Sequence, residues 1–414
     1  MTPEKLTLKI ERPVYGNVYI AKLEGKVVMV SGQTMPGETV EVVVDKDRKD
    51  YITATVSKII EPSPDRVKPE CEYFGICGGC HLQHIPYEQQ IKMKEDILSN
   101  CLKRIAKTEI GLSGSLVGNS PWKYRIRGQF KVEGDDSGFY KENTRDVVNI
   151  NKCLIMTDDL DQHFQKAREL VKMHGIKELH ITSGDRPVAL LRVSREFPHN
   201  VDMNSLVSKF TDAGFPGLSI DTGETMALNF GDPYLSLELD GLKYSVSPMS
   251  FLQSNWDVNI AMIRLIKKEL QLTGKEKILD LYAGAGNFSL PLAEGCEVTG
   301  VEENPYAIDD GARNLELNNI TRYRFVKSKA EEFHTEERPD ILILDPPRLG
   351  LSNKVTDNVL QMLPKKILYI SCNPTTFSRD IKKLLTRYEL NSVRMVDLFP
   401  QTFHIESMAV LSLK

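Results

Sequence analysis

The sequence predicts an α/β protein whose C-terminal part is a doubly wound, Rossmann-like domain, preceded by a small β-barrel and a central α+β domain. Three observations predict this organisation. In residues 241–414, apolar strands alternate with helix-length segments, the pattern of a parallel sheet with helices on both faces. Short strands fill residues 1–62, as in small barrels of the oligonucleotide-binding type. Three cysteines fall within ten residues early in residues 63–240, which indicates a metal site there.

Length and composition are those of a soluble globular chain. The 414 residues are 41% hydrophobic and 27% charged, enough for several cores and about three domains. No apolar run approaches the roughly twenty residues needed to cross a bilayer, and the first residues do not form a signal peptide. We therefore expect a cytoplasmic protein. The net charge of −4 gives no global nucleic-acid signal, so any RNA contact must come from local patches.

The N-terminal segment is rich in strand-forming residues. Residues 41–44 and 51–56 are β-rich, and residues 36–38 are a turn signal. Acids are interspersed with its cations, so the segment presents either an RNA-binding face or a solvated mixed-charge surface. Residues 61–64 are typical of a linker. The cations in question are Lys22, Lys26, Lys46, Arg48, Lys49 and Lys58.

The central segment shows one amphipathic helix and less regular patterns after it. Ile91, Leu98, Leu102 and Ile105 fall on one helix face, and Cys101 shares that face as core filler. We expect strands at residues 124–132 and 188–193 and a helix at residues 160–173. The mixture predicts an α+β domain.

The C-terminal segment has the clearest pattern. Apolar strands are predicted at residues 277–280, 297–302, 341–345 and 367–370, with helix-length segments between them. Two further strands, at residues 393–398 and 407–413, follow without a clear helix between them.

A glycine-rich turn follows the first of these strands. Gly284 and Gly286 let the backbone turn sharply beside a ligand, and Asp280 and Glu302 end the first two strands. These acids suit the cationic methionine moiety and the ribose of S-adenosylmethionine. A dinucleotide site is the alternative, but its third small position is Ser289, an imperfect match. A tight turn with packing glycines is the remaining interpretation.

A second motif ends the third strand. Asp345-Pro346-Pro347-Arg348 is similar to the Asp/Asn-Pro-Pro-aromatic loop of amino-group methyltransferases, in which the aromatic residue stacks on the base. Arg348 replaces that aromatic residue, which disfavours methylation of nitrogen. Asp345 would bind the cofactor or the edge of a pyrimidine, or would only cap the strand.

A thiol and a carboxylate complete the set. Cys372 follows an apolar strand and precedes Glu406 by 34 residues. Cys372 would lie at the carboxyl end of the sheet beside the acids, although a cysteine at a strand end is often inert core. Apolar neighbours such as Phe403 and Ile405 predict that Glu406 is partly buried, which would raise its pKa towards that of a useful base.

These groups together predict methyl transfer to carbon through a covalent intermediate. C5 of uracil is too weak a nucleophile to take a methyl group directly. A thiolate that adds to C6 makes C5 enolate-like, and a base must later remove the C5 proton. A nucleophile and a base are therefore the minimum apparatus.

The C-terminal half resembles the uracil-C5 RNA methyltransferases, which form 5-methyluridine in tRNA and 23S rRNA. The matching segments are residues 251–255, 280–288, 345–348, 371–374 and 404–407. The resemblance implies that Cys372 is the nucleophile and Glu406 the base. It also implies that the first 62 residues are the RNA-binding TRAM barrel that these enzymes often carry. The cofactor contacts implied, with the glycines of the turn, are Gln253, Tyr282, Gly284, Gly286, Asn287, Glu302 and Asp345.

The cysteine cluster offers four thiolates, from Cys71, Cys77, Cys80 and the more distant Cys153. Thiolates suit zinc or an iron–sulfur cluster, and the spacing alone leaves both open. The family resemblance implies a [4Fe-4S] cluster, so that the central domain is an iron–sulfur domain. Because methylation needs no electrons, we expect a structural or RNA-docking role.

The expected partner is an RNA substrate, tRNA or 23S rRNA, bound by a monomeric protein that meets no membrane. The target uridine must leave its stack, because C6 cannot be attacked while stacked. Arg125 and Arg127 are candidates for phosphate contacts, and His81 and His84 for RNA contacts or, preferably, packing. Two alternatives stay open: methylation of another base atom, and a non-enzymatic iron–sulfur protein that binds RNA as a sensor.

Overall fold

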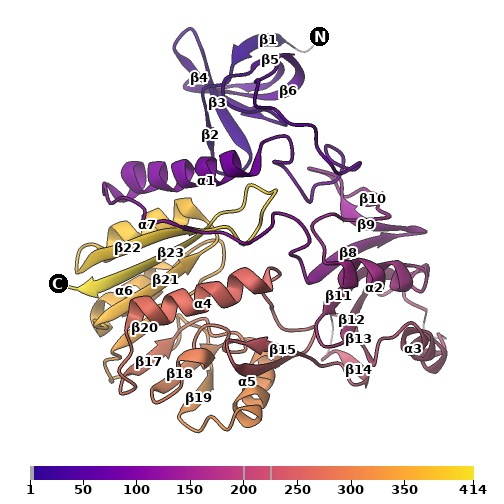
Figure 1. Ribbon diagram of the computed structural model, residues 1–414, viewed down its shortest axis with the longest axis vertical. Helices are drawn as coiled ribbons and strands as arrows, with labels where there is room; N and C mark the ends of the chain where they lie inside the picture. Colours follow the sequence, from indigo (N-terminus) through magenta and orange to yellow (C-terminus); the bar gives the residue numbers. More distant parts are fainter. Residues whose placement is uncertain (1–3, 199–200, 224–225) are drawn as a thin grey trace.

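A computed structural model describes residues 4–198, 201–223 and 226–414. Figure 1 shows the N-terminal barrel at one end of the long axis, with helix α1 lying between it and the large C-terminal sheet. The smaller central sheet lies to the side of both. Within the described residues, no helix is both long and apolar enough to span a membrane.

The N-terminal strands form a sheet in the order β1-β5-β6-β4-β3-β2. The strands expected at residues 41–44 and 51–56 are confirmed as parts of β5 and β6. Alternate residues such as Val40 and Val42 are buried in the barrel, as a half-buried strand requires. Several of the expected cations pair with acids, for example Lys22 with Glu11 at 3.6 Å. The strands are β1 Lys5–Lys9, β2 Arg12–Val14, β3 Val18–Leu23, β4 Lys26–Ser31, β5 Thr39–Asp47 and β6 Tyr51–Glu61.

The central sheet has the order β10-β9-β8-β11-β12-β13-β14 and carries two helices. Phe130 of the sheet stacks on Phe164 of α2 with ring centroids 3.8 Å apart. The helix predicted at residues 160–173 is shorter in the structure and begins earlier. It starts at Asp158, after the Thr157 cap, and ends at Arg168. The elements are β8 Arg127–Glu133, β9 Asp136–Tyr140, β10 Val147–Asn149, α2 Asp158–Arg168, β11 Ile176–Ser183, β12 Pro187–Val193, α3 Met203–Asp212, β13 Gly217–Asp221 and β14 Leu228–Gly231.

The C-terminal sheet has the order β19-β18-β17-β20-β21-β23-β22-β7. Strands β17 to β21 run parallel to one another, whereas β23 runs antiparallel to both β21 and β22. A short hairpin of β15 and β16 precedes it. The strands are β15 Leu235–Leu239, β16 Leu242–Val246, β17 Lys277–Asp280, β18 Glu297–Glu302, β19 Tyr323–Lys327, β20 Ile341–Leu344, β21 Lys366–Ser371, β22 Tyr388–Val396, β23 Glu406–Leu413 and β7 Ser115–Leu116.

Helices cover both faces of this sheet, as a doubly wound fold requires. Phe377 of α7 and Val355 of α6 pack into one core, while Met262 of α4 packs into the other. The segment between β17 and β18 differs from expectation, because it holds only the short 3-10 turn Leu290–Leu292. The helices are α4 Trp256–Leu270, α5 Pro305–Leu317, α6 Asn353–Met362 and α7 Pro374–Leu384.

Two elements from residues 63–240 pack against the C-terminal sheet. Strand β7 pairs with β22 at its outer edge. Helix α1 (Tyr87–Cys101) continues as the π-helix Leu102–Ala106, and both lie against α7. Leu98 of α1 shares its core with Leu8 of the barrel and Phe377 of α7, and Cys101 packs against that core as expected.

A buried ion pair fixes α1 to the end of β22. The Nζ atom of Lys94 lies 2.7 Å from Oδ1 of Asp397, and both side chains are almost wholly inaccessible to water. Lys94 also donates to the carbonyl of Phe399 at 3.0 Å, and the hydroxyl of Tyr87 donates to Asp397 at 2.9 Å. Burial lowers the pKa of Lys94 and the carboxylate of Asp397 raises it. Each side chain of the pair therefore stays ionised only while the other side chain is present.

Replacement of Lys94 tests this anchor. Lys94→Met would leave the Asp397 carboxylate buried without its cation, which costs about 3–5 kcal/mol. We expect a correspondingly lower urea midpoint by circular dichroism. The control is Lys92→Met, at an exposed position of the same helix, with a change of about 0.5 kcal/mol or less. Equal midpoints for the two variants would contradict the anchoring role of Lys94.

Candidate active site

The carboxyl ends of the parallel strands gather three acids and a thiol. Asp280 ends β17 and Glu302 ends β18, while Asp345 and Cys372 directly follow β20 and β21. Because these strands are parallel, all four residues lie at the same edge of the sheet.

The reversed direction of β23 brings Glu406 to this edge as well. In the antiparallel register, Ser371 lies opposite Ser407. The next pair outward in that register is Cys372 and Glu406. The proposed nucleophile and base are therefore neighbours across two adjacent strands, although 34 residues separate them in the chain.

Glu406 has a buried environment that raises the pKa of its carboxyl group. Its side chain is buried, at 5% exposure. Burial raises the pKa of Glu406 well above its ordinary value, the charge of Asp345 raises it further, and Arg348 lowers it. The ionised form therefore grows as the pH rises, and a base in this state can both take and release a proton.

Cys372 is a half-buried thiol that is not yet activated. Burial raises its pKa to about 11, the charges of Glu406 and Asp345 contribute in the same direction, and Arg348 opposes them. The thiolate fraction should therefore increase with pH over the whole range below about 11. A further positive charge at this edge would lower the pKa of Cys372 and activate it.

The carboxyl groups nearby have no basic partner that offsets their burial. Burial raises the pKa of Asp345 to about 7, with the charge of Asp280 adding to the effect. Burial likewise raises the pKa of Asp280 to about 6. Since both values lie above those of an unfolded aspartate, these acids stabilise the fold less as the pH rises through 6 and 7. A cationic ligand would restore the lost stability, so the acids suit a sulfonium or an ammonium group.

The glycine turn is shaped by Glu302. Gly284 and Gly286 have φ angles of 54° and 91°, which favour glycine. Oε2 of Glu302 accepts from the backbone NH of Gly284 at 2.9 Å, and Oε1 accepts from the NH groups of residues 303 and 304. The side-chain amides of Asn287 and Asn259 bond each other reciprocally at 2.8 and 2.9 Å. The turn is thus preformed, with the side chain of Asn287 held against α4.

Two other expected cofactor contacts lie on this edge or near it. Tyr282 lies two residues after the end of β17 and is half-buried, and burial raises the pKa of its hydroxyl. Gln253 is buried in the segment that leads into α4, beside the highly exposed Phe251. Asn255, two residues further on, caps α4 by accepting from the NH of Val258.

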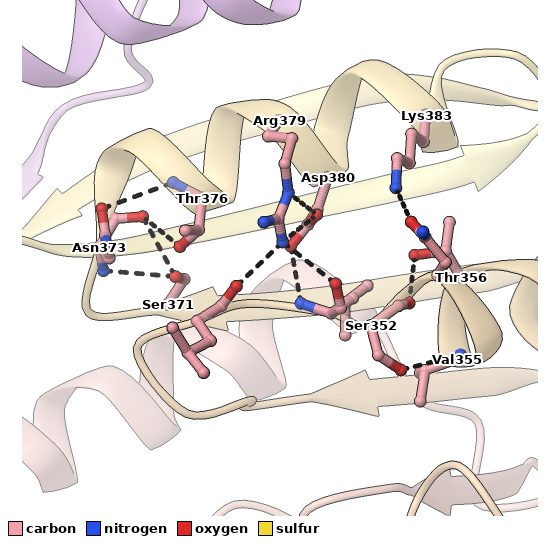
Figure 2. Close-up of polar contacts among 12 residues, drawn as sticks. Ser352, Val355, Thr356, Ser371, Asn373, Thr376, Arg379, Asp380 and Lys383 are labelled. Atoms are coloured by element: carbon pink, nitrogen blue, oxygen red, sulfur yellow. Dashed lines mark hydrogen bonds and ion pairs between the residues drawn. The ribbon is translucent and has the colours of Figure 1, made fainter.

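Helix α7 braces the loop that carries Arg348 (Figure 2). The amide of Asn373 and the hydroxyl of Thr376 both donate to the carbonyl of Arg348 at 3.2 Å. Asp380 is fully buried and accepts from the NH of Leu351 at 2.8 Å, and Arg379 donates to the carbonyl of Leu351 at 3.1 Å. Helix α7, which begins just after Cys372, therefore also holds the loop that carries Arg348. The charge of Arg348 lowers the pKa of Cys372 and of Glu406.

Residues that follow the cysteine cluster hold the segment leading to Glu406. The side chains of Gln90 and Gln401 bond at 2.9 Å, and Gln90 also accepts from the NH of Gln401. The carbonyl of Gln401 accepts from the NH groups of His81 and Leu82 at 2.8 and 3.0 Å. Gln401 has a φ of 66°, so this anchored turn is a defined conformation.

His81 and His84 are packing residues in this structure. Both are buried, and burial lowers the pKa of each to about 4. His81 contacts the ring of Phe403 with centroids 4.7 Å apart, and a ring nitrogen of His84 bonds the carbonyl of Thr34 at 3.0 Å. The preferred packing interpretation is confirmed.

The four clustered cysteines line a common cavity. Cys71, Cys77, Cys80 and Cys153 surround it together with Arg125. Burial raises the pKa of Cys153 to about 11 and that of Cys80 further still. In the described part of the chain, no three side chains are arranged to hold a single metal ion. The arrangement of these thiols therefore does not support the expected iron–sulfur site.

The expected phosphate contact of Arg127 is wrong. Its side chain is 8% exposed and donates to the carbonyls of Ser250 at 2.5 Å and Pro248 at 3.0 Å. Arg127 therefore joins the central sheet to the segment before α4. Arg125 is partly buried at the cysteine cavity, and its Nε donates to the carbonyl of Arg127 at 2.7 Å. Neither arginine presents an open surface cation.

Several residues that shape the site carry no signal in the sequence. Gln90, Gln401 and Asp380 are buried polar residues in otherwise ordinary helix or loop patterns. Tyr15, from the barrel, donates a hydrogen bond to the carbonyl of Cys372. Nothing local marks these residues, because their partners lie far away in the chain.

Comparison with known proteins places this geometry in a family context. Residues 224–414 match the family model described as tRNA (Uracil-5-)-methyltransferase. An uncharacterized RNA methyltransferase of Aquifex aeolicus is 35% identical, with 100% of both chains covered. The 23S rRNA (uracil(1939)-C(5))-methyltransferase of Shewanella amazonensis is 34% identical, with 99% of this chain and 96% of that one covered.

A solved structure shares the fold over nearly the whole chain. It is the tRNA (uracil-54, C5)-methyltransferase of Pyrococcus abyssi in complex with S-adenosyl-L-homocysteine. The TM-score is 0.75 at 24% identity, with 98% of this chain and 99% of that chain covered. The expected α/β methyltransferase fold is thereby confirmed.

Proposed function

Because the chain belongs to the S-adenosylmethionine-dependent RNA (uracil-5-)-methyltransferase family, we propose that it methylates C5 of one uridine in 23S rRNA or tRNA, with Cys372 as nucleophile and Glu406 as base. The observation that carries the proposal is the register of β21 and β23, which makes these two residues neighbours beside the acids. Cys372 and Glu406 would supply the nucleophile and the base that carbon methylation requires.

The first step is addition to the pyrimidine. The target uridine is turned out of its stack, and the Cys372 thiolate forms a bond to C6. The electron pair of the C5–C6 double bond moves into an enolate, which makes C5 nucleophilic. Arg348 favours this step because its charge lowers the pKa of Cys372.

The second part of the reaction transfers the methyl group and restores the thiolate. When bound, S-adenosylmethionine would supply a methyl group on its positively charged sulfur. C5 would form a bond to this methyl group as the sulfur–methyl bond breaks, with S-adenosylhomocysteine as the neutral leaving group. Glu406 then takes the proton from C5, the double bond re-forms, and the C6–sulfur bond breaks. The buried position of Glu406 favours this proton transfer, because burial raises its pKa towards neutrality.

The acids and the glycine turn are proposed to hold the cofactor. Burial raises the pKa of the Asp280 and Asp345 carboxyl groups, which disfavours their ionised forms. The positive charge of the cofactor would stabilise these ionised forms and would be favoured in return. Glu302 is oriented by three backbone NH groups and keeps free lone pairs for a ribose. The proposed contacts are Gln253, Tyr282, Gly284, Gly286, Asn287, Glu302 and Asp345.

The choice of RNA is proposed from the relatives. The relative from Shewanella amazonensis, named for uracil 1939 of 23S rRNA, is 34% identical, whereas the Pyrococcus abyssi enzyme named for uracil 54 of tRNA is 24% identical. We therefore favour 23S rRNA over tRNA as the substrate.

We also propose that the central domain holds a [4Fe-4S] cluster on Cys71, Cys77, Cys80 and Cys153. The four thiols line a shared cavity. A donor set of four thiolates suits either a [4Fe-4S] cluster or zinc, and the resemblance to the uracil-C5 RNA methyltransferases favours the cluster. The cluster would stiffen the segment that anchors Gln401, which is a structural role.

The nucleophile is tested with labelled S-adenosylmethionine and unmodified 23S rRNA and tRNA transcripts. Wild-type protein should label 5-methyluridine in one pool, identified after digestion to nucleosides. Cys372→Ala should lose labelling by at least about 10⁴-fold, because addition to C6 has no substitute, while calorimetry shows unchanged cofactor binding. Cys296→Ala, a buried thiol beside the amino end of β18, is the control. Full turnover by Cys372→Ala would rule out the covalent mechanism.

The base is tested by trapping. Glu406→Gln should allow addition and methyl transfer but not removal of the C5 proton, so a protein–RNA adduct should accumulate and resist denaturing electrophoresis. The double variant with Cys372→Ala should show no adduct, and Glu389→Gln, at an exposed position of β22, should turn over normally. If Glu406→Gln forms free 5-methyluridine at the wild-type rate, another residue is the base.

The cluster is tested by metal analysis of anaerobically purified protein. The wild type should contain iron and acid-labile sulfide, about four of each per chain. Cys153→Ser should lose most of both, and Cys101→Ser, which alters a thiol outside the cavity, should keep them. Stoichiometric zinc in place of iron would contradict the cluster and favour the alternative metal.

A further inference from the structure

Tyr15 lies in the barrel but reaches the catalytic edge of the C-terminal sheet. It sits in the turn between β2 and β3, followed by Gly16 and Asn17 with φ angles of 97° and 59°. This left-handed pair makes a tight turn whose geometry is defined, so the direction of the Tyr15 side chain is defined too. The barrel thereby projects one half-buried aromatic residue towards the active site.

The hydroxyl of Tyr15 is bonded to the proposed nucleophile. It donates to the backbone carbonyl of Cys372 at 2.9 Å, across 357 residues of sequence. The ring packs edge-on against Phe403, with centroids 5.9 Å apart and an interplanar angle of 79°. Phe403 lies three residues before Glu406 in the segment anchored through Gln401. One side chain of the barrel therefore touches both chain segments that carry the catalytic pair.

The hydroxyl stays protonated under working conditions and so remains a donor. Burial raises the pKa of Tyr15 to about 12, and the negative charge of the Cys372 thiolate adds to the effect. A neutral donor aimed at the Cys372 peptide fixes that peptide plane, and hence the direction in which the thiol leaves the backbone.

We propose that Tyr15 is a positioning residue for Cys372, so that docking of the barrel completes the active site. This inference rests on the proposed function, in which Cys372 is the nucleophile. The barrel then has a role in catalysis besides any role in RNA binding. It sets the orientation of a thiol that belongs to another part of the chain.

A matched pair of variants tests the proposal. Tyr15→Phe removes the hydroxyl that bonds Cys372 and keeps the ring on Phe403. Tyr19→Phe removes the same atom from the same barrel, at a residue that is 1% exposed and whose hydroxyl has no hydrogen-bond partner among the described residues. The charged and titratable neighbours of Cys372, namely Arg348, Asp345 and Glu406, are unchanged in both.

The first measurement is alkylation of Cys372 by iodoacetamide without RNA, followed by peptide mass spectrometry between pH 7 and 10. The loss of one neutral hydrogen bond should slow alkylation of Cys372 about two- to tenfold at each pH in Tyr15→Phe. Tyr19→Phe should match the wild type, and all three chains should react equally in denaturant.

The second measurement is single-turnover methyl transfer at saturating cofactor and RNA. Tyr15→Phe should lower this rate by a similar factor, with unchanged dissociation constants for cofactor and RNA. Equal alkylation of Cys372 in Tyr15→Phe, Tyr19→Phe and wild type would overturn the inference, as would equal slowing in both variants. Absence of methyl transfer by the wild type would instead reject the proposed function, and the alkylation profile would still decide the role of Tyr15.

Discussion

The antiparallel pairing of β23 with β21 is the constraint on which the site depends. A wholly parallel sheet would bring the amino end of the last strand to the opposite edge, far from the cofactor turn. Reversal of β23 brings Glu406 next to Cys372, and the register through Ser371 and Ser407 leaves no choice of partner. A slip of one residue would turn the Glu406 side chain to the other face of the sheet.

In the protein alone, the acidic groups at this edge are not balanced by positive charge. Asp280 and Glu406 are buried and Asp345 is half-buried, and burial raises the pKa of each. Cys372, beside them, has a pKa raised to about 11 by burial and by its acidic neighbours. The charge of Arg348 opposes this effect by lowering the pKa of Cys372 and of Glu406, the two proposed catalytic groups. A positively charged cofactor would complete this balance, favouring the ionised acids and the thiolate at once.

Parts of the chain that do not belong to the sheet hold the catalytic segments in place. The ion pair of Lys94 with Asp397 fixes α1 at the end of β22, and the pair of Gln90 and Gln401 anchors the segment before Glu406. The same stretch of chain begins at the cysteine cavity, and the barrel adds Tyr15 from the other side. The active site is therefore an assembly of all three parts of the molecule.

The sequence by itself determined the strands of the C-terminal sheet and the polar residues at their ends. It could do so because apolar periodicity and strand-end acids are local patterns, as at Asp280 and Asp345. The ends of elements and the helix missing between β17 and β18 were less well predicted, since caps and packing decide them. Tertiary structure alone decided that Arg127 is buried and that Tyr15 meets Cys372. Such contacts arise where surfaces from distant segments pack together, and no spacing along the chain encodes them.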